Sequence, residues 1–320
     1  MSRRIHLLTF SRCVASNCLG LDDFYGRMAA LSLVFENHCL QLPIVQCPFE
    51  ALGGDTSLTW LRAKVVNGGV SVKMVLIGDF IEEAPPQLPE WLNVSAIPGE
   101  AADGVVGLPG EQVAQLRDAD FSWVHALLPA DAGSAQLSHL VAQAEQIASD
   151  KQDVLIVTFL GGGSVCKPDR FQSMLFEGDF RVPLWIRSSQ PPCRIQTLTG
   201  SFDIPATIAD EFDTGDPDMS AKSSANGAAN LLRFAENPGM NQDRRLFVNA
   251  GSVAAVRTSD FFFAQTRDEL DAVSALYAKP EDVWNVNDVS AEYHEVVEEL
   301  RILVSQAGAD ADGAKPYGPA

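Results

Sequence analysis

A few side chains in this sequence are of types that carry chemistry, and they are scattered along the chain. Cys47 precedes Pro48 and is a possible nucleophile, but no basic residue lies near it to lower its pKa, so a buried structural thiol is favoured. Arg12 follows the apolar segment Ile5–Phe10 and is a candidate ligand for a small anion. His125 lies inside another apolar segment, where a hydrogen-bonded core histidine is favoured over a pocket residue.

Other patterns suggest ligand sites only weakly. The run 161–164 (GGGS) offers backbone amides to a phosphate, but it lacks the lysine of a P-loop, which favours a plain turn. Asp22 and Asp23 are explained as an acidic first helical turn, and the aspartates of the loop 213–227 lack the spacing of a calcium-binding hand. The six cysteines include no CxxC pair. We therefore expect no metal site and no cofactor.

Composition limits the classes of partner. The chain has 320 residues, with 23 basic and 42 acidic side chains and a net charge of −19. An acidic protein without a basic patch is a poor ligand for nucleic acid and for anionic membranes. No apolar run approaches the roughly 18 residues of a membrane span, and the basic-then-apolar start is interpreted as a strand, not as a signal peptide. Without a dense disulfide framework, a cytoplasmic location is expected.

Hydrophobic patterning predicts an α/β protein. Five short segments are apolar on both faces, as buried parallel strands are. They are Ile5–Phe10, Val72–Ile77, Phe121–Leu128, Asp153–Phe159 and Val182–Arg187. Three-four spacing of apolar residues predicts helices over Ala135–Asp150 and Ala291–Ser305. The proline-rich stretch Ala84–Gln112 is predicted to be a loop.

Several segments, in order along the chain, resemble the sulfatase family of the alkaline-phosphatase-like superfamily. The strongest matches are Phe24–Asn37, with "LVFEN", Phe176–Arg187, with "FEGDFRVPLWIR", and Ala275–Leu303, with "VVEEL". The resemblance implies a mainly parallel sheet flanked by helices and a small C-terminal antiparallel subdomain. It places the α/β core in residues 1–245, the subdomain in 246–306 and a disordered tail in 307–320.

The same resemblance implies that the family's charged site residues are missing. Ser11 and Arg12 fall where the family has a metal-binding aspartate pair, and Leu160 and Gly161 fall at its second metal pair. Val45 falls at the nucleophile. Removing even one electrostatic stabiliser typically costs about 10²–10³ in rate, so loss of all of them removes the family's mechanism. The positions expected around this altered site are Ser11, Arg12, Val45, Cys47, Asp79, His125, Leu160 and Gly161.

Three hypotheses follow. The first is a non-catalytic sulfatase homologue that acts in binding or interaction, with an unidentified protein partner. The second is an ester hydrolase with a site rebuilt from Arg12, Cys47, Asp79, His125 or Asp131. The third is a binder of small anions that uses Arg12 and the glycine turn 161–164.

Overall fold

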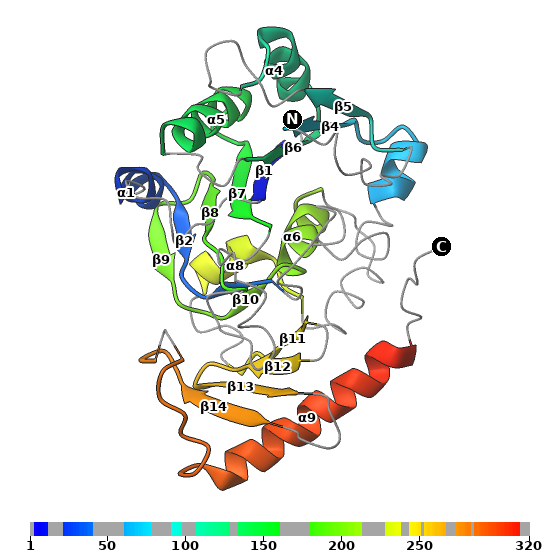
Figure 1. Ribbon diagram of the computed structural model, residues 1–320. Coiled ribbons are helices and arrows are strands. Elements are labelled where there is room, and N and C mark those ends of the chain that lie inside the picture. Colours follow the sequence, from blue (N-terminus) through cyan, green and yellow to red (C-terminus); the bar gives the residue numbers. More distant parts are fainter. Residues whose placement is uncertain are drawn as a thin grey trace.

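A computed structural model of the chain describes residues 3–11, 22–40, 61–78, 91–97, 107–128, 134–160, 180–212, 228–237, 243–250, 253–266, 273–282 and 285–313. Its main element is an eight-stranded sheet in the order β5-β4-β6-β1-β7-β8-β2-β9 (Figure 1). The strands are β1 (Ile5–Ser11), β2 (Leu33–Phe35), β4 (Val72–Ile77), β5 (Val94–Ile97), β6 (Phe121–Leu127), β7 (Val154–Phe159), β8 (Leu184–Arg187) and β9 (Cys193–Ile195).

Strand direction confirms a mainly parallel sheet, with one correction. β5, β4, β6, β1 and β7 all pair in parallel. The segment predicted as Val182–Arg187 forms β8, but β8 runs antiparallel to both β7 and β2. Burial on both faces gives a continuous apolar run whatever the strand direction, so composition could not reveal the reversal.

Three helices form a layer on the sheet: α1 (Asp22–Leu31), α4 (Gly110–Arg117) and α5 (Ser134–Ile147). The predicted apolar face of α5 is buried, since Leu137, Leu140 and Ile147 are each at most 1% exposed. The stretch Ala84–Gln112 was predicted to be a loop, and this is wrong in part, because it contains β5 and the start of α4. β5 is a short edge strand with only half-buried or exposed side chains, so its sequence carries little strand signal.

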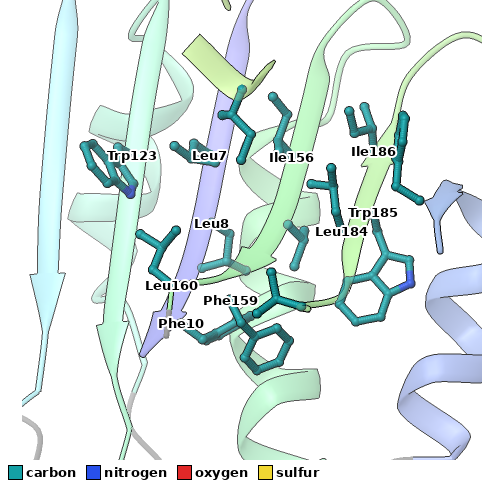
Figure 2. Packing of buried hydrophobic residues seen from close by; sticks show 14 of the residues in the cluster. Leu7, Leu8, Phe10, Trp123, Ile156, Phe159, Leu160, Leu184, Trp185 and Ile186 are labelled. Carbon is teal, nitrogen blue, oxygen red and sulfur yellow. The ribbon is translucent and has the colours of Figure 1, made fainter. Parts of the chain in front are cut away.

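Large apolar side chains fill the core along β1, β7 and β8 (Figure 2). Phe10 packs against Phe159, with ring centroids 5.3 Å apart. Trp185 lies edge-on to Phe159 at 6.3 Å and to Phe24 of α1 at 5.7 Å. These aromatic contacts join the carboxyl end of β1 to the helix layer and fix the strand ends rigidly.

The C-terminal part is a four-stranded antiparallel sheet covered by one helix, as the resemblance implied. Its elements are β11 (Leu246–Ala250), β12 (Val253–Arg257), β13 (Phe261–Thr266), β14 (Ser274–Ala278) and α9 (His294–Gly313). Val297, Leu300 and Val304 of α9 pack on one face of this sheet. The helix begins three residues after the predicted start and continues past the predicted end at Ser305, so it includes residues 307–313, which were assigned to the tail.

Between the two sheets lie β3 (His38–Cys39), β10 (Thr199–Gly200), α6 (Asp203–Glu211) and α8 (Leu231–Glu236) (Figure 1). Here Arg244, just before β11, donates from both Nη1 and Nη2 to the carboxylate of Asp203, each at 2.8 Å. Burial raises the pKa of the Asp203 carboxyl, while the Arg244 guanidinium opposes that shift. The bidentate pair therefore ties α6 to the C-terminal sheet.

No helix among the described residues is long and apolar enough to cross a bilayer.

Removing one partner of this pair should destabilise the fold strongly. Arg244→Ala leaves the fully buried Asp203 carboxylate without its cation, which should lower the free energy of unfolding by about 3–5 kcal/mol. The matched control is Arg245→Ala, which breaks a solvent-exposed pair with Glu299 and should cost about 0–1 kcal/mol. Urea denaturation of both variants measures the difference. Equal losses would show that the buried pair does not join the two parts.

Candidate functional site

Parallel pairing brings three of the sequence-predicted positions, Ser11, His125 and Leu160, together at the carboxyl-terminal edge of the large sheet. β1 pairs in register with β6 on one side and with β7 on the other. Leu160 donates its backbone N–H to the Phe10 carbonyl at 2.7 Å, and Leu128 donates to the Ser11 carbonyl at 3.1 Å. Ser11 and Leu160 are thus neighbours on adjacent strand ends, in the crevice position that ligands favour in open α/β sheets.

A chain of hydrogen bonds leads from the core to Ser11. Trp123 Nε1–H donates to Thr9 Oγ1 at 2.8 Å. Thr9 Oγ1 lies 2.8 Å from His125 Nδ1, and His125 Nε2 lies 3.1 Å from Ser11 Oγ. Thr9, Trp123 and His125 are at most 2% exposed, whereas Ser11 is only partly buried. These contacts connect the Ser11 hydroxyl to buried side chains of β1 and β6.

The direction of these bonds decides what His125 can do. An indole N–H can only donate, so Thr9 accepts from Trp123 and keeps its own hydroxyl proton available for His125 Nδ1. Where the Thr9 hydroxyl donates to Nδ1, His125 carries its proton on Nε2 and donates it to Ser11 Oγ. Where Thr9 accepts a second hydrogen bond, from Nδ1–H, the Ser11 hydroxyl donates to Nε2. Burial lowers the pKa of His125 to about 3, so the ring is neutral at pH 7. In the first arrangement the neutral ring orients the serine hydroxyl, and in the second its Nε2 accepts the serine proton in a hydrogen bond.

At this edge β4 and β6 approach each other closely. Gly78 follows β4 with φ +132°, a conformation that side chains rarely adopt. A Cβ on Gly78 would lie 2.5 Å from the Leu127 carbonyl oxygen. Because glycine has no Cβ, the backbone at the end of β4 can pack directly against Leu127 at the end of β6.

Of the other predicted site residues, five lie outside the described part of the chain: Arg12, Val45, Cys47, Asp79 and Gly161. Asp131, the loop 213–227 and the whole glycine turn 161–164 lie outside it as well. Within the described ranges, no group of three His, Cys, Asp or Glu side chains is arranged to hold a metal ion. Leu160, where the resemblance implied a metal ligand, is a hydrocarbon side chain that is 1% exposed.

Sequence reasoning missed Thr9 and Trp123 as members of the network. Thr9 precedes Ser11 by two residues, so both side chains lie on the same face of β1. A threonine and a histidine at equivalent positions of adjacent apolar strands were the available signal, but it required knowing that β1 pairs with β6 in this register. His6 shows the same pattern at the other end of β1, where Nδ1 lies 2.7 Å from Ser122 Oγ.

Comparison with solved structures identifies the fold. No protein-family model and no curated protein matches the sequence. A candidate sulfatase, yidJ of Bacteroides fragilis, matches with a TM-score of 0.64 at 8% identity, over 95% of this chain and 95% of that one. The phosphonate monoester hydrolase SpPMH of Silicibacter pomeroyi matches with a TM-score of 0.59 at 11% identity, over 97% and 95% of the two chains.

An alkaline phosphatase superfamily protein of Vibrio parahaemolyticus matches with a TM-score of 0.55 at 10% identity, over 92% of this chain and 87% of that one. The high coverage includes both the large sheet and the C-terminal sheet. The chain therefore has the alkaline-phosphatase-like fold.

Removing the centre of the network should cost more than removing a comparable buried hydroxyl. Thr9→Val removes the acceptor of the buried Trp123 indole N–H, and a buried donor without its acceptor costs about 1–3 kcal/mol. The control is Thr158→Val at the equivalent position of β7, where the hydroxyl donates only to the Pro183 carbonyl. We expect Thr9→Val to be the more destabilising variant in urea and to shift the indole N–H resonance of Trp123. An unchanged indole resonance would contradict the network.

Three buried histidines should make the fold sensitive to acid. Burial, aided by Arg4, lowers the pKa of His6 to about 4, and burial, aided by Arg244, lowers that of His38 to about 3. Burial lowers the pKa of His125 to about 3. The unfolded chain therefore takes up these protons first as pH falls through about 6.5, while above that value the histidines give no pH dependence.

We expect the free energy of unfolding to fall by about 1.4 kcal/mol per pH unit for each histidine, from about pH 6.5 down to the folded pKa values. Burial raises the pKa of Asp153 and of Asp203. These two shifts change the free energy of unfolding in the opposite direction as pH falls, because the folded chain takes up the carboxyl protons before the unfolded chain does. Urea titrations between about pH 7.5 and 5 measure the slope. His6→Gln should reduce this slope by the share of one histidine, about 1.4 kcal/mol per pH unit. A flat profile in the wild type would contradict the burial of neutral histidines.

Proposed function

From the alkaline-phosphatase-like fold and the altered edge, we propose that this protein is a sulfatase-like homologue without the metal-binding and nucleophile residues. Its role is then in binding or interaction, with a protein partner or a small anion. The observation that carries the proposal is the pair Ser11 and Leu160. They lie side by side at the carboxyl edge, where the resemblance expects ligands for a divalent cation.

The chemistry of these two side chains does not fit such a cation. Divalent cations in esterases of this kind are held by carboxylate and other hard oxygen ligands. Leu160 offers only hydrocarbon, and the Ser11 hydroxyl is engaged with His125 Nε2 at 3.1 Å. We therefore derive no catalytic step through a metal for this chain.

A second candidate is a hydrolase of sulfuric or phosphoric esters with a rebuilt site. Its specific support is that Ser11, His125 and Thr9 have the spacing of a nucleophile, a base and a residue that orients the base. The family relation adds weight, since one structural neighbour is a phosphonate monoester hydrolase. This candidate requires the opposite tautomer, in which Ser11 donates to His125 Nε2. The low pKa of His125, about 3, makes that nitrogen a weak base.

A turnover assay of the full chain separates the two candidates. The protein is incubated with 4-nitrophenyl sulfate and 4-nitrophenyl phosphate, with Mg²⁺, Ca²⁺, Mn²⁺ or Zn²⁺ added in turn, and its metal content is measured by elemental analysis. For a non-catalytic homologue, we expect rates equal to those in buffer, for the wild type and for Ser11→Ala alike, and less than one metal ion per chain.

Two results would overturn this expectation in different ways. Turnover that a chelator abolishes would restore the family's metal chemistry to the chain. Turnover that resists the chelator and is lost in Ser11→Ala, with the fold retained by circular dichroism, would establish the rebuilt site.

A further inference from the structure

A polar pocket lies at the other edge of the large sheet, where β7 begins. Its volume is about 290 Å³, close to the lower end of the range for small-molecule sites. It lies between the turn after α5, the start of β7 and the end of β8. The lining residues are Ala148, Ser149, Asp150, Lys151, Asp153, Leu155, Arg187, Ser188 and Ser189. Leu160 directly follows β7 and lies five positions after Leu155, so an extended strand places the pocket about 16 Å from the carboxyl edge.

Two of the lining residues, Arg187 and Lys151, are cationic. Arg187 Nη1 is 3.2 Å from Glu145 Oε1, and Glu145 also binds Arg27. A guanidinium has five N–H groups, so this single contact leaves Arg187 with donors for a further acceptor. Lys151 is exposed, and within the described residues its ammonium group makes no ion pair. In a chain of net charge −19, two cations beside three serine hydroxyls form a local site suited to an anionic group.

The lining also includes two carboxylates, those of Asp150 and Asp153. Asp153 is 7% exposed, and its Oδ2 accepts the backbone N–H of Asp150 at 3.1 Å. Behind it lies His6, which is 2% exposed and whose Nε2 is without a hydrogen-bond partner among the described residues. That nitrogen is 3.7 Å from Asp153 Oδ2, beyond hydrogen-bond distance. The His6 ring therefore makes no hydrogen bond to the Asp153 carboxylate, and His6 itself is not a lining residue of the pocket.

The cationic and anionic side chains together determine which charges a ligand of this pocket can carry. A simple anion placed against Arg187 and Lys151 would be repelled by the Asp153 carboxylate, and a simple amine placed on Asp153 would be repelled by the two cations. A small molecule with both groups satisfies both kinds of side chain. We propose that this pocket binds a small zwitterion, with its anionic group on Arg187 and Lys151 and its amino group on Asp153. The pocket is separate from the carboxyl edge, so this inference does not depend on the proposed function.

Binding of O-phosphoethanolamine tests this pocket, with inorganic phosphate and ethanolamine as its two separate halves. In isothermal titration calorimetry of the full chain, we expect O-phosphoethanolamine to bind at least about tenfold more tightly than either half. Arg187→Gln and Asp153→Asn should each weaken binding by about tenfold or more. The control is Arg62→Gln, which removes an exposed arginine outside the pocket and should leave the affinity unchanged.

Three outcomes would overturn the proposal. No heat with O-phosphoethanolamine up to about 10 mM would remove the site. Phosphate binding as tightly as O-phosphoethanolamine would reduce it to a plain anion site. Equal weakening by Arg62→Gln would show non-specific attraction. Because Asp153 is buried and its substitution is liable to affect folding, Lys151→Ala at an exposed position provides a second variant, with thermal unfolding as the check on folding.

Discussion

The in-register pairing of β1 with β6 and β7 determines where the described candidates Ser11, His125 and Leu160 lie. Parallel strands bring their carboxyl ends to one edge, and hydrogen bonds from Leu160 and Leu128 to β1 keep those ends level. A shift of one residue would turn Thr9 and Ser11 to the opposite face and separate them from His125. The aromatic contacts of Phe10 and Phe159 oppose such a shift, because both rings are buried and pack on each other.

Given that register, the electrostatics of the edge follow from burial. A charged histidine or carboxylate in this interior would need a partner to offset its desolvation. His125 meets the constraint by staying neutral, with Thr9 and Ser11 as hydrogen-bond partners. Asp203 meets it differently, by taking up the Arg244 guanidinium and two backbone N–H groups. His125 avoids the desolvation cost of a buried charge by staying neutral, whereas Asp203 offsets that cost by pairing with Arg244.

Sequence patterns predicted the parts of the fold that depend on local burial. The central strands are apolar on both faces, and α5 repeats its buried residues with helical spacing, so both were predicted nearly to their ends. β5 was missed because an edge strand of four residues buries little. The direction of β8 was missed because direction depends on the connection, and not on composition. The Thr9–His125 contact joins residues 116 positions apart, and only the strand order brings them together.

The direction of β8 determines which edge of the sheet receives the Arg187 side chain. Leu155 of β7 pairs with Arg187 at the end of β8, so the antiparallel strand delivers its terminal arginine to the amino edge, beside Asp153. A parallel β8 would carry the same guanidinium toward Leu160 and Ser11, where a cation could face an anionic ester. The reversal of one strand therefore places the Arg187 guanidinium at the amino edge, while the described residues at the carboxyl edge include a serine, a neutral histidine and a leucine. The proposed pocket and the carboxyl edge thus share one sheet but lie at opposite ends of its strands.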